Sequence, residues 1–169
     1  MVLFIFKAMI MKKNKKDLSW TQLLMLFLTH WKLLERIKIM KLETLRDLLT
    51  KSYAPYSNFQ VAAIAIDQEG NEYPGVNVEN AAYPSGLCAE RSALFGSVAY
   101  GAKVGTFKEI HIISKKQDEI SPCAGCRQVM TEFMSPDALI YQYSNDGSKV
   151  RVNKLSELVP YPIKPEDIK

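Results

Sequence analysis

Cysteine and histidine are scarce in this chain of 169 residues, which has three of the first and two of the second. Three cysteines are an odd number and do not sit in a loop-rich secreted framework, so a disulfide-stapled fold is a poor explanation. Glycine and proline number only eight each, which excludes collagen-like and low-complexity chains. With 47% hydrophobic and 24% charged residues, the composition is that of one globular domain, or of a domain with an arm.

Acidic residues are almost missing from the beginning of the chain. Residues 1–40 contain eight basic and two acidic residues, whereas the rest contains 14 basic and 16 acidic residues. All glycines, prolines, tyrosines and cysteines follow Met40. The overall charge of +4 therefore belongs to the N-terminal segment. The slightly acidic remainder argues against a basic groove for nucleic acid.

This division predicts a separate N-terminal arm over residues 1–39 and one domain over residues 40–169. Neither apolar stretch of the arm, residues 1–11 or 23–28, reaches the roughly 20 apolar residues of a membrane-spanning helix. A lysine run at 12–16 follows the first stretch rather than preceding it, and no small-residue cleavage site follows the second. The pattern is therefore not that of a secretory signal.

Two explanations of the arm remain. Residues 20–39 can form an amphipathic helix that binds a surface, and residues 1–39 are then the only part expected to touch a membrane. Alternatively, translation begins at Met40, which we favour because the composition becomes ordinary from that residue onward. Reduced thiols and the lack of a recognisable export signal predict a cytoplasmic protein.

The domain shows alternating helix and strand patterns. Leucines at helical spacing predict a helix from Leu42 that ends before Ala54-Pro55, because the residue before a proline disfavours the helical conformation. Apolar and β-branched runs predict five strands, and three more helices follow turn signals. The strands are expected at 59–66, 72–78, 107–114, 138–143 and 149–152, and the helices at 85–100, 122–134 and 154–159. This order predicts an α/β domain with three layers, α/β/α, around a mixed five-stranded sheet.

All three cysteines lie at expected helix starts. Cys88 opens one helix, and Cys123 and Cys126 open the next. Free backbone N–H groups and the helix dipole favour the thiolate there, which is the form that binds metal. Cys123 and Cys126 are three residues apart and share a helix face, so their sulfurs can converge on one ion. Cys88 must then come from the neighbouring helix as the third ligand.

Three thiolates on Zn²⁺ leave one tetrahedral position open, as in a catalytic rather than a closed structural site. Water in that position becomes a nucleophile, because the ion lowers its pKa towards about 7. Glu90, two residues after Cys88, can reach this water and accept its proton. We expect Arg91 to donate hydrogen bonds to the metal-bound sulfurs and to offset their negative charge.

These motifs resemble the zinc deaminase signature in an all-cysteine form. The matching residues are Cys88-Ala89-Glu90 and Pro122-Cys123-Ala124-Gly125-Cys126, and the match extends over residues 53–59, 77–84, 91–93 and 128–129. From about Leu42 to Asp167, the chain is identified as a member of the cytidine deaminase family, of the small homotetrameric type that acts on free nucleosides.

The resemblance implies zinc-dependent hydrolysis of cytidine and deoxycytidine to uridine and deoxyuridine in pyrimidine salvage, with one Zn²⁺ per subunit of a homotetramer. It implies that Glu90 carries protons from the water to ring N3 and to the leaving amine. Asn77 and Glu79 match residues that hold a ribose hydroxyl, and their alternation along an expected strand places them on one face. Phe59 matches the residue that packs against the pyrimidine, and Tyr83 one near a subunit boundary.

Two positions depart from the family pattern. Ala62 stands where the family commonly has glycine, so its methyl group must find room in the sheet. Ile163 stands where an aromatic residue often reaches into a neighbouring subunit's site, so aliphatic packing replaces stacking there.

Other functions stay open on the sequence alone. A deaminase of a related aminopyrimidine nucleoside or a nucleoside antibiotic shares the zinc site and differs in the sugar-binding residues. A zinc-stabilised binding module without turnover needs a fourth ligand, and His111 is the only histidine in the domain. Because His111 lies between Ile110 and Ile112 in an expected strand, we expect it to face outward. A redox dithiol at Cys123 and Cys126 leaves the third cysteine unexplained.

Overall fold

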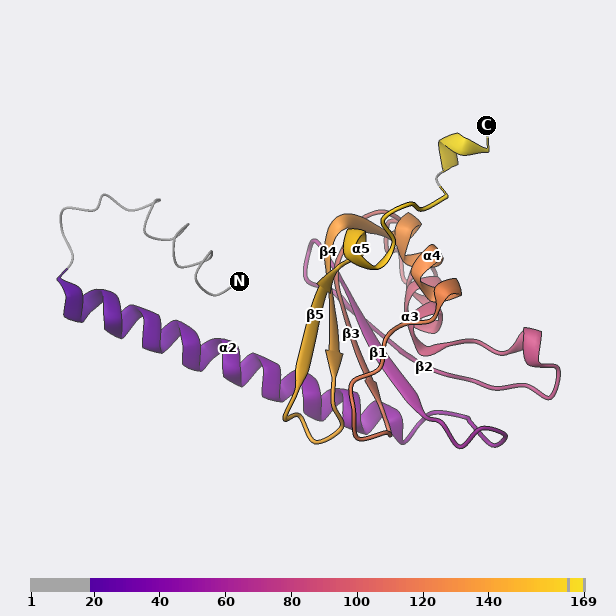
Figure 1. Cartoon of the computed structure of the whole chain (residues 1–169), viewed down its shortest axis with the longest axis horizontal. Coiled ribbons are helices and arrows are strands. Elements are labelled where there is room, and N and C mark those ends of the chain that lie inside the picture. The colour runs from indigo at the N-terminus through magenta and orange to yellow at the C-terminus, as the bar shows by residue number, and fades with distance from the viewer. Residues whose placement is uncertain (1–18, 164, 169) are drawn as a thin grey trace. The chain divides into compact units, whose positions relative to one another are not determined.

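The computed structural model describes residues 19–163 and 165–168 of the chain (Figure 1). The first apolar stretch and the lysine run of the arm, residues 1–11 and 12–16, lie outside these residues. The chain divides into two compact units, Met1–Met40 and Lys41–Lys169.

The described part of the arm is helical. Helix α2 (Trp20–Leu49) includes residues 20–39 and continues through the helix expected from Leu42. It begins at Trp20 because Ser19, just before the helix, and Gln22, in its first turn, form a capping box. The Ser19 N–H donates to Gln22 Oε1 at 2.9 Å, and the Gln22 N–H donates to Ser19 Oγ at 3.3 Å. No glycine or proline interrupts the helix before Leu49. Within the described residues, no helix is long and apolar enough to cross a membrane.

The second unit is built around one five-stranded sheet in the order β2-β1-β3-β4-β5. Strands β3 and β4 pair in parallel, and the other neighbouring pairs are antiparallel, so the sheet is mixed as predicted. The strands are β1 (Val61–Asp67), β2 (Glu72–Val76), β3 (Phe107–Ser114), β4 (Met134–Tyr143) and β5 (Val150–Lys154).

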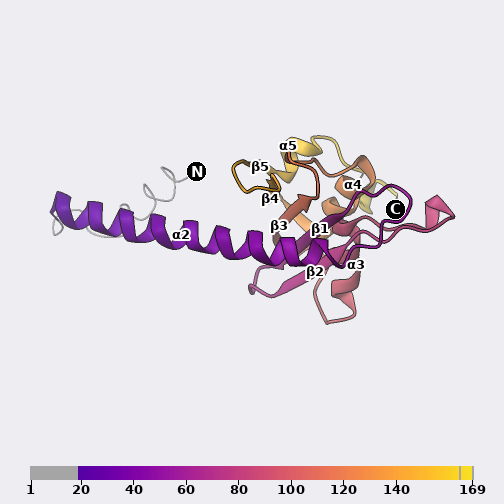
Figure 2. The ribbon, with the colours of Figure 1, turned by 90° about the horizontal axis from the view of Figure 1, so that it is seen from below.

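Helices cover both faces of this sheet (Figures 1 and 2). Helices α3 (Ala89–Val98), α4 (Ala124–Phe133) and α5 (Leu155–Leu158) lie on one face. Their buried side chains pack with those of alternate strand residues such as Ala63, Ile110 and Ile112. On the other face, Leu45 and Leu49 at the end of α2 pack against the opposite alternation of strand residues, which includes Ala62, Ile64, Ile113 and Tyr143. The three-layer α/β/α prediction is confirmed.

Several element ends differ from the predicted ones. Strand β2 ends at Val76, two residues early, and β4 begins at Met134 rather than at Ala138. The longer β4 arises because Met134 pairs with Phe107 before the register shifts. Helix α3 begins at Ala89, after the separate 3₁₀ turn η1 (Tyr83–Ser85). A second 3₁₀ turn, η2, covers Pro165–Asp167.

Two small residues let the layers approach each other. Ala62 is completely buried in the core on the α2 side, where its methyl group finds room. At Gly75, a Cβ atom would lie 2.3 Å from the backbone N of Ala93 and 2.4 Å from the carbonyl O of Ala89. Strand β2 therefore rests directly on the backbone of α3, and this contact fixes the height of the first turn of α3 above the sheet.

Candidate metal centre and active site

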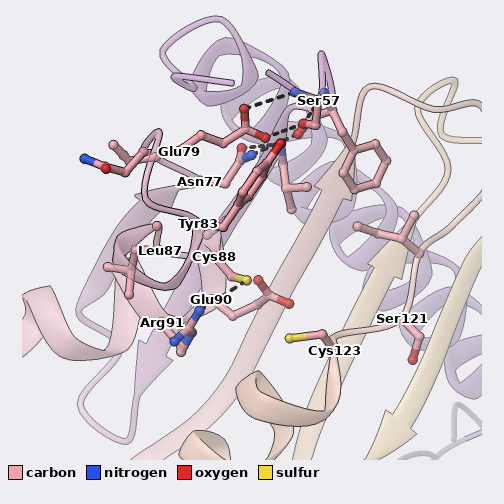
Figure 3. A pocket seen from close by; sticks show the side chains of 17 residues that line it. Ser57, Asn77, Glu79, Tyr83, Leu87, Cys88, Glu90, Arg91, Ser121 and Cys123 are labelled. Atoms are coloured by element: carbon pink, nitrogen blue, oxygen red, sulfur yellow. Dashed lines mark hydrogen bonds between the residues drawn. The ribbon is translucent and has the colours of Figure 1, made fainter. Parts of the chain in front are cut away.

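The starts of α3 and α4 bring the three cysteines together. Cys88 is the N-cap of α3, and Cys123 is the N-cap of α4. The Cys123 sulfur accepts a hydrogen bond from the Cys126 N–H at 3.5 Å. All three Sγ atoms lie within 4.8 Å of one another. Figure 3 shows the side chains of Cys88 and Cys123 pointing into the same space. The structure therefore juxtaposes the three residues proposed as ligands.

This sulfur cluster fits a zinc ion. Thiolates bind zinc at about 2.3 Å, so two tetrahedral sulfur ligands lie about 3.8 Å apart. The sulfurs of Cys123 and Cys126 are 3.4 Å apart, and a small movement accommodates the ion. Among the described residues, the group that can hold a metal here consists of the three cysteines, and His111 does not belong to it. Three ligands leave a tetrahedral position for water, which is the arrangement of catalytic zinc sites.

The charges around the sulfurs favour a thiolate at Cys88. Hydrogen bonding from the Cys126 thiol, followed by hydrogen bonding and attraction from Arg91, lowers the pKa of Cys88 to about 5. Arg91 Nη2 lies 3.6 Å from Cys88 Sγ and donates to it. The same thiol-to-thiolate hydrogen bond and burial raise the pKa of Cys126. A guanidinium beside the sulfurs suits a cluster that carries negative charge.

Glu90 is a buried carboxyl group in the first turn of α3. Its residue surface is only 4% exposed, and its side chain points towards the space between Cys88 and Cys123 (Figure 3). Burial raises the pKa of Glu90, and the neighbouring Cys88 thiolate raises it further. A carboxyl group with a raised pKa next to a metal position is suited to accepting and returning a proton near neutral pH.

The site opens into a cavity of about 400 Å³. Every proposed site residue lines this cavity except Cys126, which is buried behind it. Cys88, Cys123, Glu90 and Arg91 form one group on the wall, and Figure 3 shows Asn77 and Glu79 apart from them, beside Ser57. This volume lies in the usual range for small-molecule sites.

Asn77 and Glu79 face the cavity from just beyond β2, not from within a strand as expected. Val78 between them makes isolated bridges to Tyr53 and Leu87, which keeps the segment extended and puts both side chains on the cavity side. Asn77 Oδ1 accepts from the Val61 N–H at 2.8 Å. Its Nδ2 donates to the Phe59 carbonyl at 2.9 Å. Since an amide nitrogen has two hydrogens, the second remains for a ligand.

Glu79 is held by the loop before β1. Its Oε2 accepts hydrogen bonds from the Tyr56 N–H at 2.9 Å and the Ser57 N–H at 3.2 Å, and its Oε1 accepts from the Ser57 hydroxyl. The hydrogen bond from Ser57 is the main cause that lowers the pKa of Glu79, so this side chain is a carboxylate at neutral pH. It therefore acts as an acceptor towards a hydroxyl group.

Two aromatic residues complete the wall. Phe59 is half-buried, and its N–H donates to the Ser57 hydroxyl at 3.0 Å. Tyr83 lies in η1 and is 73% exposed although it lines the cavity. Its ring centroid is 6.3 Å from that of Tyr56.

His111 is buried, which corrects the expectation that it faces outward. Only 5% of its surface is exposed. Its ring stacks on Tyr141 with centroids 4.5 Å apart, and Nδ1 lies 2.9 Å from the Tyr143 hydroxyl. Its Nε2 lies 3.2 Å from Glu109 Oε2. These partners lie on the α2 side of the sheet. The His111 side chain is therefore buried in a polar cluster on the face opposite the sulfurs.

The structure also shows residues that the motifs do not single out. Ser57 and Ser52 hold Glu79 and Asn77 through their hydroxyl groups. Ile120 and Ser121 line the cavity from the loop before α4. Ser57 lies inside the matching segment 53–59, and its position beside Glu79 depends on a contact distant in sequence.

Comparisons with known proteins agree with this geometry. A family model, described as the cytidine and deoxycytidylate deaminase zinc-binding region, matches residues 38–142. The cytidine deaminase of Sporosarcina psychrophila is 34% identical over 118 residues, which cover 70% of this chain and 85% of that protein. The probable cytidine deaminase of Dictyostelium discoideum is 41% identical over 105 residues, which cover 62% of this chain and 70% of that protein.

A solved structure gives the same result. The crystal structure of cytidine deaminase from Burkholderia pseudomallei has a TM-score of 0.67 and 38% sequence identity, with 72% of this chain and 95% of that chain covered. The fold and the three-sulfur site are those of a zinc-dependent deaminase. The chain belongs to the cytidine and deoxycytidylate deaminase family.

Proposed function

We propose that this enzyme hydrolyses the free nucleosides cytidine and deoxycytidine to uridine and deoxyuridine, with release of ammonia. One observation carries the proposal: the buried Glu90 and the sulfurs of Cys88 and Cys123 line the same cavity as Asn77 and Glu79, and Cys126 completes the sulfur cluster beside it. The first group suits attack on an aromatic ring carbon, and the second suits the hydroxyl groups of a sugar. A cytosine nucleoside has both parts.

Glu90 is the proton carrier in this proposal. Cys88, Cys123 and Cys126 would hold the zinc ion, which would supply a water molecule activated for attack at neutral pH. As the water oxygen bonds to C4 of the pyrimidine, Glu90 takes a proton from the water and delivers it to ring N3. Glu90 then carries the second proton to the amino group, the C4–N bond breaks, and ammonia leaves. Because its pKa is raised, Glu90 can both accept a proton from the water and give it up to the substrate near neutral pH.

Three other residues orient the nucleoside. The Glu79 carboxylate accepts a hydrogen bond from a ribose hydroxyl, and the second N–H of Asn77 donates a hydrogen bond to the oxygen of that hydroxyl. The Phe59 ring packs against the pyrimidine. All three residues are half-buried, and hydrogen bonds fix the side chains of Asn77 and Glu79, which supports these roles because fixed groups lose little entropy on binding.

Arg91 keeps the cluster of sulfurs from carrying excess negative charge. Its contact with Cys88 supports this role, because a donor to a metal-bound sulfur draws charge away from the metal. An Arg91→Ala variant is expected to bind zinc more weakly.

We further propose a cytoplasmic homotetramer in pyrimidine salvage, with Tyr83 near a subunit boundary. The exposure of Tyr83 at 73%, in a wall of the cavity, supports a neighbouring subunit that closes the site. Ile163 is 62% exposed, and its carbonyl accepts from Gln128 Nε2 at 2.9 Å, so its side chain is available for such a contact.

Residues 40–169 suffice for activity in this proposal, and residues 1–39 are dispensable. The site residues all lie in the second unit, which supports this division. Deletion of residues 1–39 should leave kcat and KM for cytidine unchanged.

The function is tested by incubating zinc-loaded protein with cytidine and with deoxycytidine and separating the products. We expect uridine or deoxyuridine and one ammonia per nucleoside consumed. Cytosine nucleosides that stay intact while another aminopyrimidine is hydrolysed would move the assignment to that substrate class.

A further inference from the structure

Phe59 lines a second cavity in addition to the candidate active site. That neighbouring space, of about 370 Å³, is lined by Ser57, Asn58, Phe59, Lys115 and Lys116. Ser57 and Phe59 belong to both cavities, whereas the two lysines line only the second one. Phe59 therefore borders both the candidate active site and a lysine-lined space.

Lys116 reaches over this ring. Its ammonium nitrogen lies 5.3 Å from the centroid of the Phe59 ring, within the range of a cation–π interaction. The loop that carries it is anchored at two points. The Lys115 N–H donates to the Gln60 carbonyl at 3.0 Å, and the Lys116 N–H donates to the Ser114 hydroxyl at 3.2 Å. The ammonium group is thus supported from the end of β3, close to the start of β1.

The acidic residues of this loop form ion pairs with residues other than Lys116. Asp118 pairs with Lys149 at 3.5 Å, and Glu119 pairs with Arg151 at 2.7 Å. Neither Lys115 nor Lys116 forms an ion pair with any of the described residues. The ring of Phe59 is the contact that the structure gives to the ammonium group of Lys116.

We propose that Lys116 is a positioning residue that holds the Phe59 ring in place to receive the pyrimidine. The backbone of Phe59 is already fixed, because its N–H donates to Ser57 and its carbonyl accepts from Asn77. Backbone hydrogen bonds do not restrict rotation about its side-chain torsions, and the residue is only half-buried. Lys116 restricts that movement from the second cavity, which it lines and the candidate active site does not share. The inference rests on the proposed nucleoside deamination and on the proposed role of Phe59.

The test compares steady-state kinetics of cytidine deamination in the zinc-loaded wild type, Lys116→Met and Lys116→Arg. Methionine keeps the length of the side chain and removes the charge. We expect Lys116→Met to raise KM by about two- to five-fold with kcat unchanged, the effect of losing an exposed cation–π contact of about 0.5–1 kcal/mol. Lys116→Arg should retain the wild-type KM.

Lys115→Met is the matched control. It removes the same charge from the adjacent residue, which lines the same cavity. The cation–π contact with the Phe59 ring is made by Lys116 and not by Lys115. We expect its KM to equal that of the wild type. Equal increases in Lys115→Met and Lys116→Met would show a general charge effect and overturn the proposal, as would an unchanged KM in Lys116→Met.

A double-mutant cycle identifies the route of the effect. In a Phe59→Leu background, Lys116→Met should change KM no further. A further increase of the same size would show that Lys116 acts on the nucleoside directly, which contradicts the proposal. Failure of the proposed function is distinguished beforehand, because the wild type itself would then not consume cytidine. A changed kcat at constant KM in Lys116→Met would also overturn the assignment.

Discussion

A methyl group added at Gly75 should displace α3 and so disturb the active site, although Gly75 itself does not line the cavity. The Cβ atom of Gly75→Ala would lie 2.3 and 2.4 Å from two backbone atoms of α3, whereas ordinary contact begins at 3.4 Å. Strand β2 and α3 must therefore separate by about 1 Å, since neither atom belongs to a flexible side chain. Cys88 caps α3 and Glu90 lies in its first turn, so this shift moves Glu90, the proposed proton carrier, and Cys88 together relative to Cys123 and Cys126 on α4.

The size of the effect follows from two known costs. Overpacking of a dense core costs about 1–3 kcal/mol in the free energy of unfolding. A misplacement of about 1 Å at a reacting centre can lower the rate by about 100-fold. Gly75→Ala should therefore unfold at lower urea concentration, and the folded fraction should deaminate cytidine about 100-fold more slowly.

Gly96→Ala is the control within the same helix. A Cβ atom at Gly96 meets nothing within 4 Å, and alanine is the better helix former. It should raise the free energy of unfolding by up to about 1 kcal/mol and leave kcat and KM unchanged. Wild-type activity and stability in Gly75→Ala would refute the argument that the contact of β2 with α3 positions the site.

Three further predictions concern other parts of the second unit. Ser57→Ala should raise KM for cytidine more than it lowers kcat, because Glu79 loses its hydroxyl donor; an unchanged KM would show that the two N–H donors suffice. Glu109→Gln should reduce the free energy of unfolding by about 1 kcal/mol at pH 7, because its carboxylate loses the charge-assisted hydrogen bond of His111. The His111 hydrogen bond lowers the pKa of Glu109, so this stabilisation is present above the ordinary glutamate pKa and is lost as the pH falls through the lowered one; an equal difference in urea midpoint at acidic and neutral pH would contradict it. Removal of zinc with a chelator should abolish turnover, and added zinc should restore it.

The sequence predicts the sulfur cluster well because part of its geometry is local and each cysteine lies at a helix start. Cys123 and Cys126 are three residues apart at a helix start, so helix periodicity and end effects determine how these two are arranged. The approach of Cys88 depends on the packing of α3 beside α4, which the family motif implies but local geometry does not specify. The mixed sheet and the three layers also follow from the alternation of helix and strand segments, whereas the order of the strands in the sheet is not specified by that pattern. Strand β3 has the bounds that its apolar run predicts.

Contacts between distant segments could not be predicted in the same way. The burial of His111 depends on Tyr141 and Tyr143, which the parallel pairing of β3 with β4 brings beside it. The support of Glu79 by Ser57 depends on a loop that precedes β1. The requirement for glycine at position 75 arises from the distance between β2 and α3, which no local pattern specifies.

The central claim is that Glu90 carries protons beside a zinc ion held by the three cysteines. The direct test measures zinc content and cytidine turnover together in the wild type and in Glu90→Gln. We predict one zinc per chain in both proteins, and a rate in Glu90→Gln that is lower by about 10²–10⁴-fold, the range of general acid–base catalysis. A Glu90→Gln variant that contains zinc and turns over cytidine at the wild-type rate would contradict the account.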